Sequence, residues 1–201
     1  MKLNLPNKLT LLRFILALVM IILFSFPYAS CGWTPTVIPT TTFTVIDLVC
    51  CIIFIVGSIT DTLDGQIARK RNLVTNFGKF MDPLADKFLV NSALVLLACY
   101  KQSYLPVVIV VLMLGRDLAV DGMRFLASTK GEVIAANIYG KLKTVAQMIA
   151  IPFIFLNGFP FNYFCGEYTY IFTIVFASIA LVFSLLSGVI YIYRGRKFIV
   201  D

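Results

Sequence analysis

The sequence has no histidine and few acidic residues. Among its 201 residues, 10 are aspartate or glutamate and 17 are lysine or arginine, which gives a formal net charge of +7. The absence of histidine excludes histidine-based catalysis and metal ligation by imidazole. The five cysteines have no metal-binding spacing either. Cys31 and Cys165 lie in two expected outer loops, where a disulfide is conceivable in an oxidising compartment, but a role as small apolar side chains is favoured for all five.

Charged residues are scarce over the whole chain. They make up 13% of it, whereas hydrophobic residues make up 60%, and the mean hydropathy is +0.92. Soluble domains contain about 45–50% apolar residues, so an ordinary soluble protein is excluded. The sequence therefore predicts an integral membrane protein that forms a single domain over residues 1–201.

Six hydrophobic segments are each close to the roughly 20 residues that a helix needs to cross a bilayer. They cover approximately residues 11–30, 43–66, 80–100, 104–127, 139–160 and 168–193. Strands of a membrane barrel would alternate apolar and polar residues, and these segments do not. We therefore expect an all-α polytopic membrane protein with six transmembrane helices.

The basic residues predict the orientation of these helices. All of them except Lys101 fall at the ends of the chain or around the connections on one side of the membrane. The positive-inside rule makes that side cytoplasmic, so both termini are expected to face the cytoplasm from the cell membrane. The positive charge then serves topology and contacts with anionic lipids, and nucleic acid is not expected as a partner.

The second, third and fourth segments share one pattern of charge. Each has a long uncharged run toward its outer end, such as Leu48–Thr60, and charged residues in its cytoplasmic half. Charged side chains in a membrane segment face other helices or a water-filled cavity, because exposure to lipid is costly in free energy. The three charged halves are therefore expected to surround a polar cavity that opens at the cytoplasmic leaflet.

Four of the ten acidic residues lie in the stretch DTLDGQIARKRNLVTNFGKFMDPLAD, residues 61–86. Asp61 and Asp64 are three positions apart, and Asp82 and Asp86 are four apart, so each pair projects from one face of its helix. Four carboxylates without histidine or cysteine make an oxygen-rich site suited to Mg²⁺ or Mn²⁺. Two such ions can hold a transferring phosphoryl group.

Other interpretations of the aspartates stay open at this point. The carboxylates could pair with nearby basic residues and only stabilise the fold, or they could line a divalent-cation channel or transporter. A channel predicts polar residues as far as the outer surface, but the outer halves of these segments are nearly all apolar apart from Asp47. A membrane prenyltransferase also uses aspartate-rich helices, but more helices are expected of it. Spacing alone favours phosphoryl transfer.

The same stretch contains the motif D-x2-D-G-x2-A-R-x8-G-x3-D-x3-D. It is formed by Asp61, Asp64, Gly65, Ala68, Arg69, Gly78, Asp82 and Asp86. The motif resembles the signature of the CDP-alcohol phosphotransferase family, and the resemblance extends to chain length, helix number and orientation. It implies an enzyme that displaces CMP from a CDP-linked lipid with an alcohol, and it suggests a homodimer.

The resemblance also implies roles for individual residues. Asp61, Asp64 and Asp82 would hold two metal ions, and Asp86, the fourth carboxylate of this metal site, would act as the general base on the acceptor hydroxyl. The CDP group would contact Asp61 and Asp64 together with Gly65, Ala68, Arg69 and Gly78.

The acceptor alcohol has to be inferred from residues outside the motif. The cytoplasmic ends of the fourth and fifth segments carry a group of cations that suits an acceptor with its own phosphate, namely Arg116, Arg124, Lys141 and Lys143. The alternative is that these cations serve topology and pair with Asp117 and Asp121. Asp121 and Arg124 are three positions apart, which makes a pair between them credible, but a role in binding the acceptor is favoured for the group.

Three sequences outside the motif, NLPNKLTLLR, GRDLAVDGMR and GKLKT, are similar to the phosphatidylglycerophosphate synthase branch of the family. The resemblance implies transfer of the phosphatidyl group of CDP-diacylglycerol to sn-glycerol 3-phosphate, with inositol phosphate as the nearest competing acceptor. Asp117 and Asp121 depart from the branch, where a glutamate and a small hydroxyl residue are expected. Asn7, Thr10 and Arg13 share one helical face and serve either capping and topology or the active site.

Overall fold

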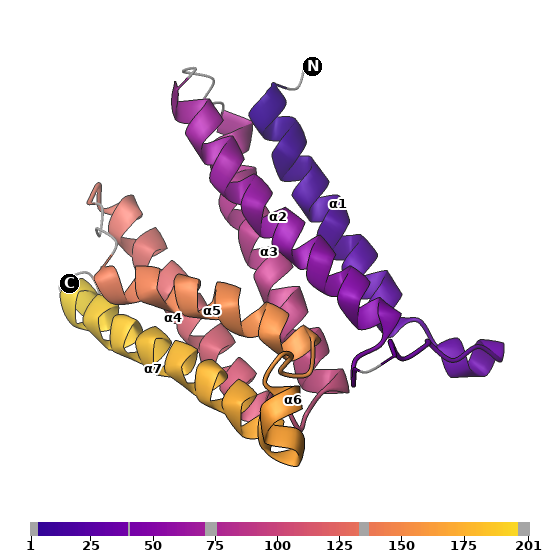
Figure 1. Ribbon diagram of the computed structural model, residues 1–201. Helices are drawn as coiled ribbons and strands as arrows, with labels where there is room; N and C mark the ends of the chain where they lie inside the picture. Colours follow the sequence, from indigo (N-terminus) through magenta and orange to yellow (C-terminus); the bar gives the residue numbers. More distant parts are fainter. Residues whose placement is uncertain (1–3, 40, 71–75, 133–136, 197–201) are drawn as a thin grey trace.

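The computed structural model describes residues 4–39, 41–70, 76–132 and 137–196 (Figure 1). The side chains at positions 5, 62–70, 76, 77, 79 and 167 lie outside this description. Within the described ranges the protein is all-helical, with seven α-helices, two short 3-10 helices and no strand. The predicted all-α class is confirmed.

Six long helices correspond to the six hydrophobic segments. They are α1 (Leu5–Ser25), α2 (Val45–Lys70), α3 (Asn76–Tyr100), α4 (Val107–Thr129), α5 (Ile138–Phe155) and α7 (Thr169–Gly195). Short elements lie in the connections, namely η1 (Tyr28–Cys31), α6 (Asn162–Cys165) and η2 (Gly166–Tyr168). Cys31 and Cys165 are free thiols.

Two of the predicted segments, 11–30 and 139–160, run past the C-terminal ends of their helices, and the local sequence explains both. α1 ends at Ser25 because Phe26 adopts an extended conformation, which residues that precede a proline favour. α5 ends at Phe155 because Asn157 and Gly158 have positive φ angles of 51° and 78°. Any side chain at position 158 would also clash, since its Cβ would lie 2.3 Å from Cγ2 of Thr169.

Four of the described helices are long and apolar enough to cross a membrane. These stretches are Pro6–Ser25, Phe80–Tyr100, Ile138–Phe155 and Thr169–Gly195. α4 has four charged residues from Arg116 to Arg124, and α2 also ends in charged residues, which lowers their apolarity. The chain is thus a membrane protein, while six spans and cytoplasmic termini stay predictions.

The long helices form two groups. α1 packs against α2 and α3, whereas α4 and α5 both pack against α7. Contacts of α5 with α2 and α3, and of α4 with α3, join the groups. Figure 1 shows that they lie closest together near α6 and diverge toward the two ends of the chain. Fully buried apolar side chains fill the space where they meet, among them Phe54, Leu89, Leu97, Ile151 and Phe155.

A buried ion pair ties the two groups together near α6. Nζ of Lys101, just after α3, lies 2.9 Å from Oδ1 of Asp47 on α2, and both side chains are 9% exposed. The ammonium also donates to the Phe155 carbonyl at 2.7 Å and to Oδ1 of Asn157 at 2.6 Å. Burial lowers the pKa of Lys101, and the Asp47 charge opposes that shift. The ends of α3 and α5 are therefore fixed to the start of α2.

We predict that Asp47→Asn destabilises the protein strongly, because the Lys101 ammonium would stay buried without its counter-charge. Removal of one partner of a buried ion pair costs about 3–5 kcal/mol. The double variant Asp47→Asn, Lys101→Met should recover part of this loss, since no charge then remains buried. Thermal unfolding in detergent measures both effects. A single variant as stable as the wild type would contradict the prediction.

Candidate active site

Helix α1 lies against the two helices that carry the aspartates. Arg13 is fully buried, and its Nη1 lies 2.7 Å from Oδ1 of Asp61 on α2. Thr10 is also fully buried, and its hydroxyl donates to Oδ1 of Asp82 on α3. Asn7 is buried on the same helix. The structure therefore brings two of the three residues of this helical face directly to the aspartates.

Asp86 lies on α3, one turn beyond Asp82. Its carboxylate is within electrostatic range of Asp61 and Arg13, and also of Lys143 and Lys87. Among the described residues, no hydrogen bond or close ion pair engages the Asp86 carboxylate. Asp86 thus stands between the aspartates near α1 and a group of cations, with its oxygens available to a ligand.

The chemistry of the donor set fits a hard divalent cation. Every proposed ligand is a carboxylate, and the chain has no histidine that would favour a softer metal. No group of three ligating side chains forms within the part of the chain that the structure describes. Gly78 is buried on α3. Four residues of the motif lie on α2 outside the described side chains: Asp64, Gly65, Ala68 and Arg69.

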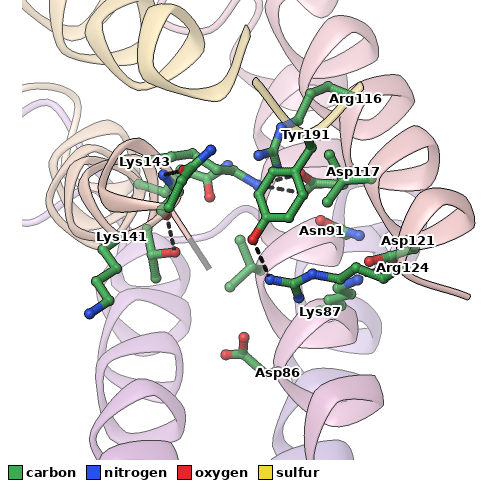
Figure 2. A pocket seen from close by; sticks show the side chains of 16 residues that line it. Asp86, Lys87, Asn91, Arg116, Asp117, Asp121, Arg124, Lys141, Lys143 and Tyr191 are labelled. Carbon is green, nitrogen blue, oxygen red and sulfur yellow. Dashed lines mark hydrogen bonds and ion pairs between the residues drawn. The ribbon is translucent and has the colours of Figure 1, made fainter. Parts of the chain in front are cut away.

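A cavity of about 270 Å³ lies beside Asp86, between α3, α4, α5 and α7 (Figure 2). All four cations predicted to bind the acceptor line it. The charged residues described in its wall are Lys87, Arg116, Arg124, Lys141, Lys143, Asp86, Asp117 and Asp121. Five basic residues against three acidic ones leave an excess of two positive charges, which matches the charge of a phosphate monoester near neutral pH.

Asp117 holds two of these cations in place. The buried Lys143 donates to both oxygens of Asp117, with Nζ 2.6 Å from Oδ1. Nη1 of Arg116 lies 2.8 Å from the same Oδ1. Lys141 is exposed and points away from the other labelled side chains in Figure 2. Asp117, which departs from the sequence pattern of the branch, is therefore the shared anion of the cavity wall.

The alternative of a pair between Asp121 and Arg124 is not realised. Asp121 makes an ion pair with Lys87 on α3 instead. Nη2 of Arg124 donates to the Tyr191 hydroxyl on α7 at 2.6 Å, and the guanidinium lies 5.1 Å from the centre of that ring. Lys87 on α3 and Tyr191 on α7 both line the cavity, so they take the place of a partner within α4.

Sequence reasoning missed the uncharged polar residues of this region. Asn91, Asn137, Gln147 and Tyr191 line the cavity. One signal was available, because Ser184, Ser187 and Tyr191 follow a helical spacing of i, i+3 and i+7 within an apolar segment. Asn137 also stands directly before α5 and caps it by accepting from the Gly140 amide.

A family model described as CDP-alcohol phosphatidyltransferase matches residues 3–189. The chain belongs to this family. It is therefore a phosphatidyltransferase enzyme, from a family that is generally metal-dependent. The match includes the aspartate motif, α3, α4 and α5, and it includes α7 as far as Val189, two residues before Tyr191.

Three curated relatives share the name CDP-diacylglycerol–glycerol-3-phosphate 3-phosphatidyltransferase. The protein of Bacillus subtilis (strain 168) is 43% identical over 159 residues, which cover 79% of this chain and 80% of the relative. That of Haemophilus influenzae is 32% identical over 203 residues, covering 100% and 98%. That of Salmonella typhimurium is 34% identical over 156 residues, covering 77% and 78%.

We predict that Thr10→Val lowers the stability of the protein, because Asp82 loses a buried hydroxyl donor. A hydrogen bond to a charged group contributes about 1.5–3 kcal/mol. Thr10→Ser keeps the hydroxyl and should lose much less stability. Thr129→Val is a matched control, since the Thr129 hydroxyl bonds only its own helix at an exposed site. Equal melting temperatures for Thr10→Val and Thr129→Val would show that the contact with Asp82 has no effect on stability.

Proposed function

We propose that the enzyme transfers the phosphatidyl group of CDP-diacylglycerol to sn-glycerol 3-phosphate, giving phosphatidylglycerol phosphate and CMP. The names of the relatives support this donor and this acceptor. The observation that carries the proposal is the position of Asp86, whose carboxylate no described side chain engages by a hydrogen bond or close ion pair. It lies at the edge of a cavity with an excess of positive charge. A base and a phosphate-binding wall thus lie side by side.

The cavity wall supports an acceptor that carries its own phosphate. Arg116, Arg124 and Lys143 come from two helices and are each held by a fixed partner. Cations held in this way can bind a phosphate with little loss of side-chain entropy. A neutral alcohol such as glycerol or serine would leave the positive charges of the wall without a counter-charge. Lys141, at the edge of the cavity, would add long-range attraction.

The reaction requires one proton transfer and one displacement. A hydroxyl oxygen of the acceptor attacks the phosphorus that bears diacylglycerol, and its proton passes to a carboxylate oxygen of Asp86. The bond between that phosphorus and the oxygen of the CMP phosphate breaks, and CMP leaves with the bonding electron pair. Asp86 suits this role because the other described aspartates are already held, Asp61 by Arg13 and Asp82 by Thr10.

Asp61, Asp64 and Asp82, with Asp86 next to them, would hold two Mg²⁺ or Mn²⁺ ions. When bound, such ions neutralise the negative charge of the pyrophosphate. Gly65, Ala68, Arg69 and Gly78 would contact the CDP group. The site would face the cytoplasm, because the basic connections are expected on that side of the membrane.

We predict that the purified protein with Mn²⁺ or Mg²⁺ releases CMP from CDP-diacylglycerol when glycerol 3-phosphate is added. Glycerol at the same concentration differs only by the phosphate and should support little release. Inositol phosphate tests the competing acceptor, and serine tests a neutral one. CMP release that is as fast with glycerol or serine would contradict a phosphate-selective acceptor site.

We predict that Asp86→Asn loses about 10²–10⁴-fold in turnover, because the amide cannot accept the proton of the acceptor hydroxyl. The variant has nearly the same shape, so binding of CDP-diacylglycerol should stay close to that of the wild type. CMP release and binding of the CDP-lipid are measured on the same preparation. If metal binding is lost instead, Asp86 is a metal ligand and the base lies elsewhere.

A further inference from the structure

The side chain of Arg116 extends from α4 and packs against α7 at Ser187 and Gly188. Its Nη2 donates to the Ser187 hydroxyl at 2.5 Å, while Nη1 bonds Asp117. The arginine side chain is only 11% exposed. These two contacts use two of its five N–H groups, so the other N–H groups remain to donate to a ligand in the cavity.

Asn137 controls the direction in which the Ser187 hydroxyl points. Ser187 is fully buried and donates its only hydroxyl hydrogen to Oδ1 of Asn137 at 2.8 Å. The lone pairs of the hydroxyl oxygen then remain for the Arg116 guanidinium. Nδ2 of Asn137 in turn donates to the Ser187 carbonyl at 3.3 Å. This reciprocal pair fixes both side chains at the boundary of α5 and α7.

Gly188 provides the space in which the arginine side chain lies. A Cβ at position 188 would come within 2.8 Å of Cγ of Arg116 and 3.4 Å of its Nε. Cγ is near the base of the side chain, so relief of this clash would move the whole guanidinium. Gly122 on α4 is different, since a Cβ there would meet nothing within 4 Å.

These contacts complete a ring of interactions around the cavity wall. Arg116 bonds Ser187, which bonds Asn137 at the start of α5. The same helix carries Lys143, which bonds Asp117 beside Arg116. Three helices are therefore locked together through the cations that face the cavity.

We infer that Ser187, Gly188 and Asn137 are positioning residues that act through Arg116 and set the selectivity of the enzyme for a phosphorylated acceptor. The inference deepens the proposed function and rests on it. A guanidinium held at one place binds a phosphate without first losing rotamer entropy. Loss of the contacts of Arg116 with Ser187 and Gly188 would weaken acceptor binding and leave the aspartate site unchanged.

The test compares Ser187→Ala and Gly188→Ala with the wild-type enzyme in KM and kcat for both substrates. Each variant should raise KM for glycerol 3-phosphate by about tenfold, the effect of about one charged hydrogen bond. KM for CDP-diacylglycerol should change by less than about twofold. Calorimetric binding of glycerol 3-phosphate without the CDP-lipid should weaken by the same factor as KM rises.

Matched controls on the same helices separate positioning from general disturbance. Ser184→Ala removes a buried hydroxyl one turn earlier on α7, which has no hydrogen-bond partner among the described residues. Gly122→Ala adds a methyl group to α4 in open space. Neither residue lines the cavity, and both variants should keep the wild-type KM values. If Gly188→Ala fails to fold, Ser187→Ala alone decides the test.

A double-variant cycle distinguishes an action through Arg116 from an independent structural role. Arg116→Gln should weaken acceptor binding more than Ser187→Ala, and the double variant should be no worse than Arg116→Gln alone. The inference would be overturned if the effects of Arg116→Gln and Ser187→Ala on acceptor binding multiplied in the double variant. An unchanged KM for glycerol 3-phosphate in Ser187→Ala would also overturn it. If wild-type enzyme binds glycerol 3-phosphate but releases no CMP, the proposed function fails and the binding measurements still judge the positioning role. If it does not bind glycerol 3-phosphate, both fail.

Discussion

Pairing of charges between helices is the interaction on which this structure depends. In a chain with so many apolar residues, a charged side chain must find a counter-charge or a polar cavity, because burial of a lone charge costs several kcal/mol. The pair of Arg13 with Asp61 joins α1 to α2, and that of Lys143 with Asp117 joins α5 to α4. The contacts that hold the helices together therefore also position the groups of the active site.

The two sides of the site are built differently. On the α1 side, Arg13 and Thr10 hold carboxylates, which suits the binding of metal cations and, through such cations, of an anionic nucleotide. On the α7 side, Asp117 holds cations, which suits the binding of a phosphate. Asp86 lies at the boundary and is the described carboxylate that neither side engages. The proposed reaction, which joins a CDP-lipid to a phosphorylated alcohol, would use both sides.

Much of the site could be predicted from the sequence, since its chemistry is concentrated in short motifs. Periodicity placed the aspartates on helices, and the rule on charges in membranes predicted a polar cavity between the second, third and fourth segments. The cavity that the described residues form lies instead between α3, α4, α5 and α7. The partners of these residues could not be predicted. Whether Arg124 meets Asp121 or Tyr191, and whether Lys101 meets Asp47, depends on how helices distant in sequence rotate against one another. The end of α1 was missed although Pro27 marks it, because an apolar run continues past the proline.

The cap of α5 has a consequence for the length of the chain around it. Asn137 fixes the first turn of the helix, so Lys143 reaches Asp117 only at its present number of positions after the cap. An α-helix turns by about 100° per residue, and one residue inserted between the two would rotate Lys143 out of the cavity wall. Residues inserted before Asn137 would leave this count unchanged. Natural variants are therefore expected to keep a constant length between Asn137 and Lys143 and to tolerate differences in length before Asn137.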